Sequence, residues 1–78
     1  MSEPLLNTVK RIMADILEVD ERSINDATEM GVVEQWDSGN HIGLVLALEE
    51  EFGVSFEVSE IEEMTSFPDV VATLERKL

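Results

Sequence analysis

Residues 36–54 read WDSGNHIGLVLALEEEFGV, and the pattern of this stretch indicates a helical fold. Apolar residues recur in it at the spacing of an amphipathic helix. Asp37 is a favourable N-cap, and Gly53 suits the left-handed residue that ends many helices. We therefore expect a helix from Asp37 to about Phe52. Ser38 then lies in the first turn, where backbone N–H groups lack intrahelical acceptors and attract negative charge.

This expected helix has two unlike faces when its residues are placed 100° apart. One face should pack into the core, and it contains His41, Leu44, Val45, Leu48 and Phe52. The opposite face combines apolar side chains with glycines and glutamates, which is typical of a docking surface for a protein partner. The predicted partner-binding residues are Gly39, Ile42, Gly43, Leu46, Glu49 and Glu50.

The sequence before this helix predicts one long helix and one long loop. Apolar residues recur at helical spacing over about residues 4–18, with Ser2 as the N-cap and Pro4 in the first turn. Residues 19–36 show no sustained period and form a loop. Its apolar residues should hold it against the core; they are Val19, Ile24, Met30 and Val32.

The sequence after Gly53 predicts a short helix and a final longer one. Ser59 and Glu62 have the spacing of a capping box, which marks the start of the short helix. The last helix begins near Ser66, and its expected buried residues are Phe67, Val70, Val71, Leu74 and Leu78. The predicted fold class is all-α. A single domain, residues 1–78, forms a small four-helix bundle with three longer helices and one short helix.

The composition limits what the chain can do. It has 78 residues, a net charge of −13, one histidine and no cysteine or tyrosine. These residues offer few acid–base groups, and Ser38 with His41 lacks a third orienting residue, so we do not expect an enzyme. The negative field opposes nucleic-acid binding and self-association and favours basic protein partners, so we expect a monomer. No apolar run approaches the ~20 residues of a membrane span and no signal region is present, so we expect a cytoplasmic protein.

Several other residues have structural interpretations. Trp36, the only tryptophan, is expected to anchor the loop, and His41 to be a hydrogen-bonded packing residue. The loop also contains the oxygen donors Asp20, Glu21, Asn25, Asp26 and Glu29. They lack the order of an EF-hand, so we expect no metal site.

Residues 36–54 resemble the Asp-Ser-Leu motif and second helix of acyl carrier proteins. The similarity extends over nearly the whole chain, including Thr65, Ser66 and Phe67 at the start of the last helix. The resemblance implies that Ser38 receives 4′-phosphopantetheine from coenzyme A, and that Asp37 caps the helix and takes part in recognition by the phosphopantetheinyl transferase. The thiol of this arm would hold an acyl or aminoacyl group as a thioester. Other implied partners are a loading ligase or acyltransferase and acyl-using enzymes with basic docking patches.

The sequence departs from the family pattern at three positions. Gly39 follows the serine where Leu or Met is usual, and Asn40 and Gly43 stand where many fatty-acid carriers have acidic residues. These departures favour a carrier of a dedicated pathway over the general fatty-acid carrier. Fatty acyl, polyketide, aminoacyl and specialised sugar- or lipid-modification pathways all stay open. The alternative function is an unmodified acidic helical adaptor that docks a basic partner; only the carrier function requires Ser38.

Overall fold

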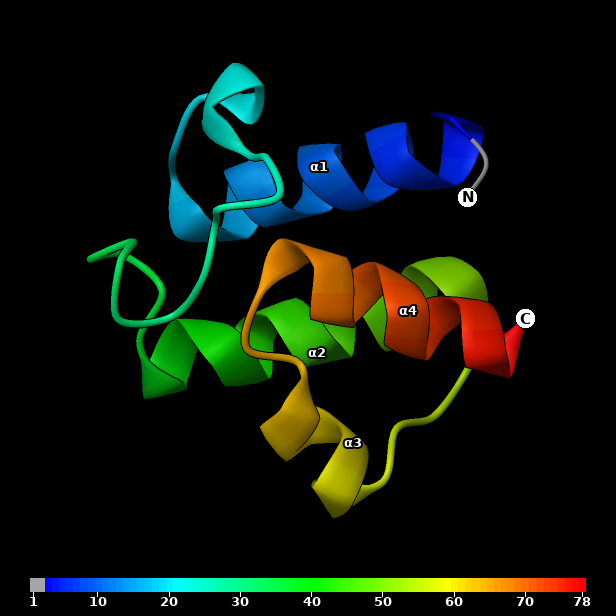
Figure 1. Ribbon diagram of the computed structural model, residues 1–78. Coiled ribbons are helices and arrows are strands. Elements are labelled where there is room, and N and C mark those ends of the chain that lie inside the picture. The colour runs from blue at the N-terminus through cyan, green and yellow to red at the C-terminus, as the bar shows by residue number, and fades with distance from the viewer. Residues whose placement is uncertain (1–2) are drawn as a thin grey trace.

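The computed structural model describes residues 3–78, and it confirms the predicted fold class (Figure 1). The four α-helices are α1 (Glu3–Leu17), α2 (Ser38–Phe52), α3 (Val58–Glu63) and α4 (Phe67–Lys77), and a short 3₁₀ helix, η1 (Glu21–Ser23), lies in the long loop. No strand forms within residues 3–78. The expected capping role of Ser2 falls outside the described residues.

The core lies between α1, α2 and α4. Helices α1 and α2 run in opposite directions, and α4 lies beside them (Figure 1). Apolar side chains from all three are completely buried; they are Val9, Met13, Leu17, Leu44, Leu48, Val70, Val71 and Leu74. Burying each such side chain stabilises the fold by about 1.5–3 kcal/mol relative to leaving it in water. This shared core fixes the position of α2.

The long loop is fastened at two places. The N–H of Met30 donates to the carbonyl of Thr65 at 2.9 Å, and the N–H of Phe67 donates to the carbonyl of Thr28 at 2.9 Å. These bonds attach the loop to the start of α4. Of the residues expected to hold the loop against the core, Ile24, Val19 and Met30 do so. The prediction was wrong for Val32, which is 67% exposed because it lies in a turn that projects from the bundle.

Both ends of α2 confirm the prediction. The carboxylate of Asp37 accepts the N–H of Asn40 at 2.9 Å, which is the hydrogen bond of an N-cap. Gly53 ends the helix in the left-handed conformation, with φ = 65°, and its N–H donates to the carbonyl of Glu49. The helix therefore begins and ends where the sequence indicates.

Two predictions about α3 and α4 were wrong. The N-cap of α3 is Glu57 rather than Ser59, because the Glu60 carboxylate turns back to accept the N–H of Glu57 at 2.9 Å. In α4, Ser66 caps the helix as expected by accepting the N–H of Asp69. Leu78, expected to be buried, is 66% exposed because the helix ends at Lys77 and the last side chain has no neighbouring helix to cover it.

Candidate functional site

The candidate site is the exposed hydroxyl of Ser38 in the first turn of α2. Asp37 accepts the N–H of Asn40, and its carbonyl accepts the N–H of His41 at 2.8 Å. The N–H groups of Ser38 and Gly39 precede these and have no acceptor within the helix, as is usual for a first turn. A phosphate ester on the Ser38 oxygen would meet these donors and the positive end of the helix dipole, an effect worth ~0.3–1 kcal/mol at an exposed site.

The approach to Ser38 is open on the side of Gly39. A β-carbon built on Gly39 would meet only the Asp37 carboxylate, at 3.6 Å, which is an ordinary contact. Nothing in this geometry requires glycine there, because a β-carbon fits without distortion. The exposed serine and the uncrowded residue after it are compatible with a covalently attached phosphate arm.

Hydrogen bonds hold the loop before Ser38 against the first turn of α2. The side-chain amide of Asn40 donates to the carbonyl of Gln35 at 2.7 Å, in addition to the cap formed by Asp37. This second bond stops the loop from swinging away from the helix start. Sequence reasoning treated Asn40 only as a departure from the family pattern and missed its role in positioning. The spacing between Gln35 and Asn40 does not predict this hydrogen bond, because the bond depends on the path that the loop takes.

A buried chain of hydrogen bonds lies on the core side of the same turn. Trp36 and His41 are buried, with 2% and 7% of their surfaces exposed. The indole Nε1–H donates to His41 Nδ1 at 3.0 Å, and His41 Nε2 lies 2.8 Å from the carbonyl oxygen of Ile61 at the end of α3. Because an indole nitrogen can only donate, Nδ1 is the acceptor and Nε2 carries the proton; this tautomer follows from the hydrogen-bond pattern. The predictions for Trp36 and His41 are confirmed, and their direct contact is new.

The outer face of α2 has the exposed apolar side chains that the sequence predicted. Ile42 is 53% exposed and Leu46 is 58% exposed. Gly39 belongs to the same exposed surface, whereas Gly43 is half-buried and its missing β-carbon would lie 3.8 Å from the Ile16 side chain of α1. Gly43 is therefore turned toward α1 more than toward solvent. Whether either glycine contacts a partner stays a prediction.

The three consecutive glutamates at the end of α2 have different surroundings. Glu49 accepts the backbone N–H of Phe56 at 2.7 Å and so fastens the loop between α2 and α3. Glu51 lies 3.6 Å from Arg11 of α1. The side chain of Glu50 is exposed and makes no hydrogen bond or ion pair with any other residue in the range 3–78. Of these three carboxylates, only Glu50 is left for a partner without breaking an existing contact.

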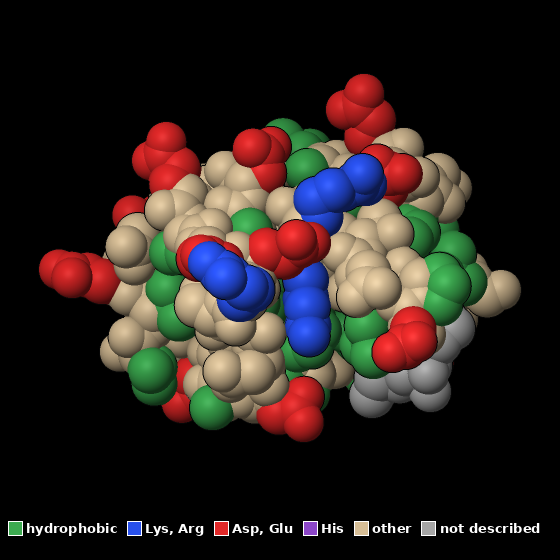
Figure 2. Space-filling model, turned by 90° about the horizontal axis from the view of Figure 1, so that it is seen from above, with side chains coloured by type: hydrophobic (Ala, Val, Ile, Leu, Met, Phe, Trp, Pro, Cys, Tyr) green, Lys and Arg blue, Asp and Glu red, His purple; other side chains and the backbone are tan. Residues whose placement is uncertain are grey.

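Basic residues are confined to two parts of the chain. All five lie at positions 10, 11, 22, 76 and 77, so residues 23–75 contain no lysine or arginine and hold thirteen of the eighteen acids. Figure 2 looks onto α1 and η1, where basic and acidic side chains lie among one another. Arg76 and Lys77 form ion pairs with Glu63 and Glu60 of α3. Helix α2 therefore has no basic side chain of its own to offset its three glutamates.

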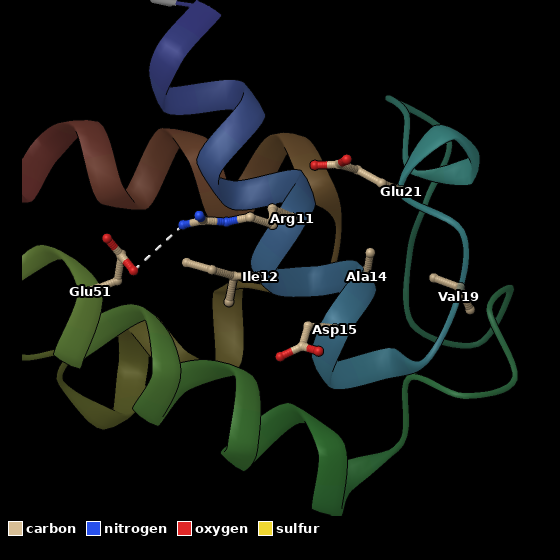
Figure 3. Close-up of a pocket in the computed structure, with 7 residues that line it drawn as sticks. All are labelled: Arg11, Ile12, Ala14, Asp15, Val19, Glu21 and Glu51. Atoms are coloured by element: carbon tan, nitrogen blue, oxygen red, sulfur yellow. Dashed lines mark ion pairs between the residues drawn. The ribbon is translucent and has the colours of Figure 1, made fainter.

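An open hollow follows the seam between α1 and α2 and extends to η1 (Figure 3). Figure 3 shows Arg11 reaching across it toward Glu51, with Asp15 also pointing into the seam. Glu51 lies thirteen residues after Ser38, or about 20 Å along the helix axis. Because charged side chains form its rim and Ser38 lies at the other end of α2, this hollow is not part of the candidate site.

Within residues 3–78, no helix is both long enough and apolar enough to cross a membrane. Among residues 3–78, no group of three or more histidine or acidic side chains is placed to hold a metal ion. In the loop, Asp20 accepts hydrogen bonds from the backbone N–H and guanidinium of Arg22. These contacts hold the pKa of Asp20 below its ordinary value and that of Arg22 above its own. They occupy the Asp20 carboxylate in a local, exposed turn.

Comparison with known proteins bears directly on this site. Residues 7–74 match the family described as phosphopantetheine attachment site. The acyl carrier protein of Thermotoga maritima is 30% identical over 76 residues, which cover 97% of this chain and 94% of that protein. The acyl carrier protein of Thermosynechococcus vestitus is 34% identical over 74 residues, covering 95% and 91%. The chain therefore belongs to the acyl carrier protein family, whose members are carriers with a covalently attached 4′-phosphopantetheine arm and interact with the transferase that attaches it and with acyl-handling enzymes.

Proposed function

We propose that this protein carries an acyl or aminoacyl group as a thioester on a phosphopantetheine arm attached to Ser38. The observation that carries this proposal is the exposed Ser38 hydroxyl, held in a capped first turn that has two free backbone N–H groups. A carrier needs its attachment oxygen to be accessible and its surroundings to be rigid. The bonds formed by Asp37 and Asn40 supply that rigidity without covering the hydroxyl.

The attachment step is a phosphoryl transfer that a separate transferase catalyses. The Ser38 oxygen attacks the phosphorus that bears the pantetheine of coenzyme A, and the bond to the adenosine part breaks. The serine proton passes to a base on the transferase, and adenosine 3′,5′-bisphosphate leaves. The product carries a terminal thiol, which this cysteine-free chain otherwise lacks. The tether then raises the effective concentration of the cargo at each docked enzyme.

The surface proposed for docking is the outer face of α2 beside Ser38. Ile42 and Leu46 supply exposed apolar area, and Glu50 supplies an unpaired negative charge. A partner with a basic rim around an apolar patch would match both properties. Gly39 is exposed and would let a partner approach the backbone of α2 closely, whereas Gly43 faces Ile16 of α1. Glu49 would act by holding the end of the helix. Gly39, Asn40 and Gly43 differ from the usual fatty-acid carrier pattern, which supports a dedicated biosynthetic pathway.

The direct test is the intact mass of the protein after incubation with coenzyme A, magnesium and a broad-specificity phosphopantetheinyl transferase. We expect a gain of one phosphopantetheine. Ser38→Ala should abolish the gain, and Ser55→Ala, which removes another exposed serine, should leave it unchanged. Circular dichroism should show that both variants are folded.

A folded parent that gains no mass, with a transferase active on a control carrier, would have two explanations: the protein is not a carrier, or Gly39 excludes this transferase. The same experiment with Gly39→Leu identifies the cause. Modification of that variant alone would mean that Gly39 excludes the transferase used. No modification of either protein would favour the unmodified adaptor, whose docking face would be the same.

A further inference from the structure

The part of the core nearest to Ser38 is already filled by two hydrogen-bonded rings. Trp36 lies two residues before the serine, and His41 lies one helical turn after it. Their ring centres are 6.0 Å apart. Trp36 is in contact with the main hydrophobic core, and His41 bonds to the carbonyl of Ile61. Together these three residues join the loop, α2 and α3 immediately behind the attachment point.

A cargo attached to Ser38 would have to displace these rings to enter the core beside the serine. The displacement would leave the indole N–H, the imidazole and the carbonyl of Ile61 without their partners, and an alkyl chain offers no replacement. Unpaired buried polar groups are strongly unfavourable. No buried side-chain nitrogen or oxygen of residues 3–78 lacks a partner now, so the arrangement is complete without a ligand.

We propose that the Trp36–His41–Ile61 chain closes the core to the cargo, so that the acyl group is carried in solvent. This inference rests on the proposed carrier function and specifies the cargo class. Short or polar acyl and aminoacyl groups, which gain little from burial, fit such a carrier. Long alkyl groups do not, because they would stay exposed to water.

A chain-length series tests the closed core. Octanoyl and butyryl phosphopantetheine are attached from the corresponding acyl-coenzyme A thioesters, and each product is identified by its mass. Hydroxylamine then attacks the thioester carbonyl; a C–N bond forms, the C–S bond breaks, and the hydroxamate and the free thiol are released. The cleavage rate of each protein thioester is divided by that of the same acyl-coenzyme A in solution. This ratio reports how well the protein shields the cargo.

We expect the octanoyl and butyryl ratios to agree within about twofold. Each CH₂ that leaves water favours burial about fourfold, so four additional methylenes would favour the buried state by about 250-fold and slow octanoyl cleavage by far more than twofold. That slowing, with amide shifts at Leu44, Leu48 or Ile61 on octanoylation, would overturn the inference. A protein that gains no arm at all would instead contradict the proposed function, and this inference with it.

Two variants test whether the Trp36 ring keeps the cargo out of the core. Trp36→Ala removes one of the rings, and we expect octanoyl cleavage to become slower than butyryl cleavage. Met13→Ala, at an equally buried position on α1, is the matched control and should leave the two rates equal. Equal rates in a folded Trp36→Ala protein would overturn the role of the rings. If Trp36→Ala does not fold, Trp36→Phe, which keeps a ring but removes the N–H donor, takes its place.

Discussion

Helices α1 and α2 have the same length of fifteen residues, yet they use their apolar residues differently. In α1 the residues that face inward are buried, including Val9 and Met13, and no large apolar side chain is exposed among its described residues. In α2 two large apolar side chains, Ile42 and Leu46, face solvent although the core is complete without them. The packing of the fold explains α1 fully. In α2 it explains only the inward-facing residues. The exposed apolar residues on the outer face of α2 indicate a functional surface.

The largest expected effect separates the two faces of α2. Leu48 is completely buried, whereas Leu46, two residues away, is 58% exposed. We expect Leu48→Ala to lower the free energy of unfolding by about 2–5 kcal/mol and Leu46→Ala to change it by less than about 0.5 kcal/mol. Urea denaturation followed by circular dichroism measures both. If the two variants lose similar stability, Leu46 is part of the core and the distinction between the faces is wrong.

The next effect compares the C-terminal ends of the two helices. Glu18 follows α1 with φ = 57°, and Gly53 follows α2 with φ = 65°. A side chain in this left-handed region costs about 1–2 kcal/mol. We therefore expect Gly53→Ala to destabilise the protein by about 1 kcal/mol and Glu18→Gly to stabilise it by up to about 1 kcal/mol. Thermal unfolding of both variants checks this, and shifts of the same sign would contradict it.

A smaller contrast concerns two adjacent carboxylates of α2. Glu49 accepts the N–H of Phe56, whereas Glu50 projects into solvent. Both changes to alanine have the same effect on helix propensity, so their difference isolates the hydrogen bond. We expect Glu49→Ala to lose about 1 kcal/mol more stability than Glu50→Ala. Only Glu50→Ala should slow association with a basic partner at unchanged stability, as stopped-flow binding at low salt would show. The reverse assignment would mean that Glu49 is the docking residue.

The smallest effect concerns the ion pair between Glu60 of α3 and Lys77 of α4. The N–H of Glu57 and the ammonium of Lys77, 2.7 Å away, hold the pKa of Glu60 below its ordinary value of 4.5. The unfolded chain therefore takes up the Glu60 proton at a higher pH than the folded protein does. This stabilisation is fully present above about pH 4.5 and is lost as the pH falls through the folded pKa. Glu60→Gln should flatten this part of the stability profile in acid denaturation; an unchanged slope would contradict the assignment.

Helix ends could be predicted from the sequence where the contacts that fix them are local. The caps of α2 are Asp37 and Gly53, and each acts within a few residues of its own position. The start of α3 was not predictable, because Ser59 and Glu57 both have a glutamate three residues later. Glu60 was selected as the partner, and it also pairs with Lys77, seventeen residues further along. Pattern reasoning has no access to a contact of that kind.

The same limit applies to the site. The place of Ser38 in the first turn, its Asp37 cap and the exposed Ile42 and Leu46 could be predicted from capping preferences and helical spacing. The role of Ser38 as an attachment point came from the resemblance to acyl carrier proteins. The hydrogen bond from His41 to Ile61 joins residues twenty positions apart and depends on where α3 is placed. The burial of Trp36 and His41 was therefore predicted, but the hydrogen bonds that connect Trp36, His41 and Ile61 were not.

The absence of lysine and arginine between residues 23 and 75 has a practical consequence for detecting the modification. Trypsin cuts after basic residues, so it would release residues 23–76 as one long acidic peptide that contains Ser38. Amine-reactive cross-linkers would likewise find no lysine on α2, although that helix is the proposed contact surface. A survey based on tryptic peptides or lysine cross-links would overlook both the arm and its partners. A protease that cuts at acidic residues, or a carboxylate-directed cross-linker, would reveal them.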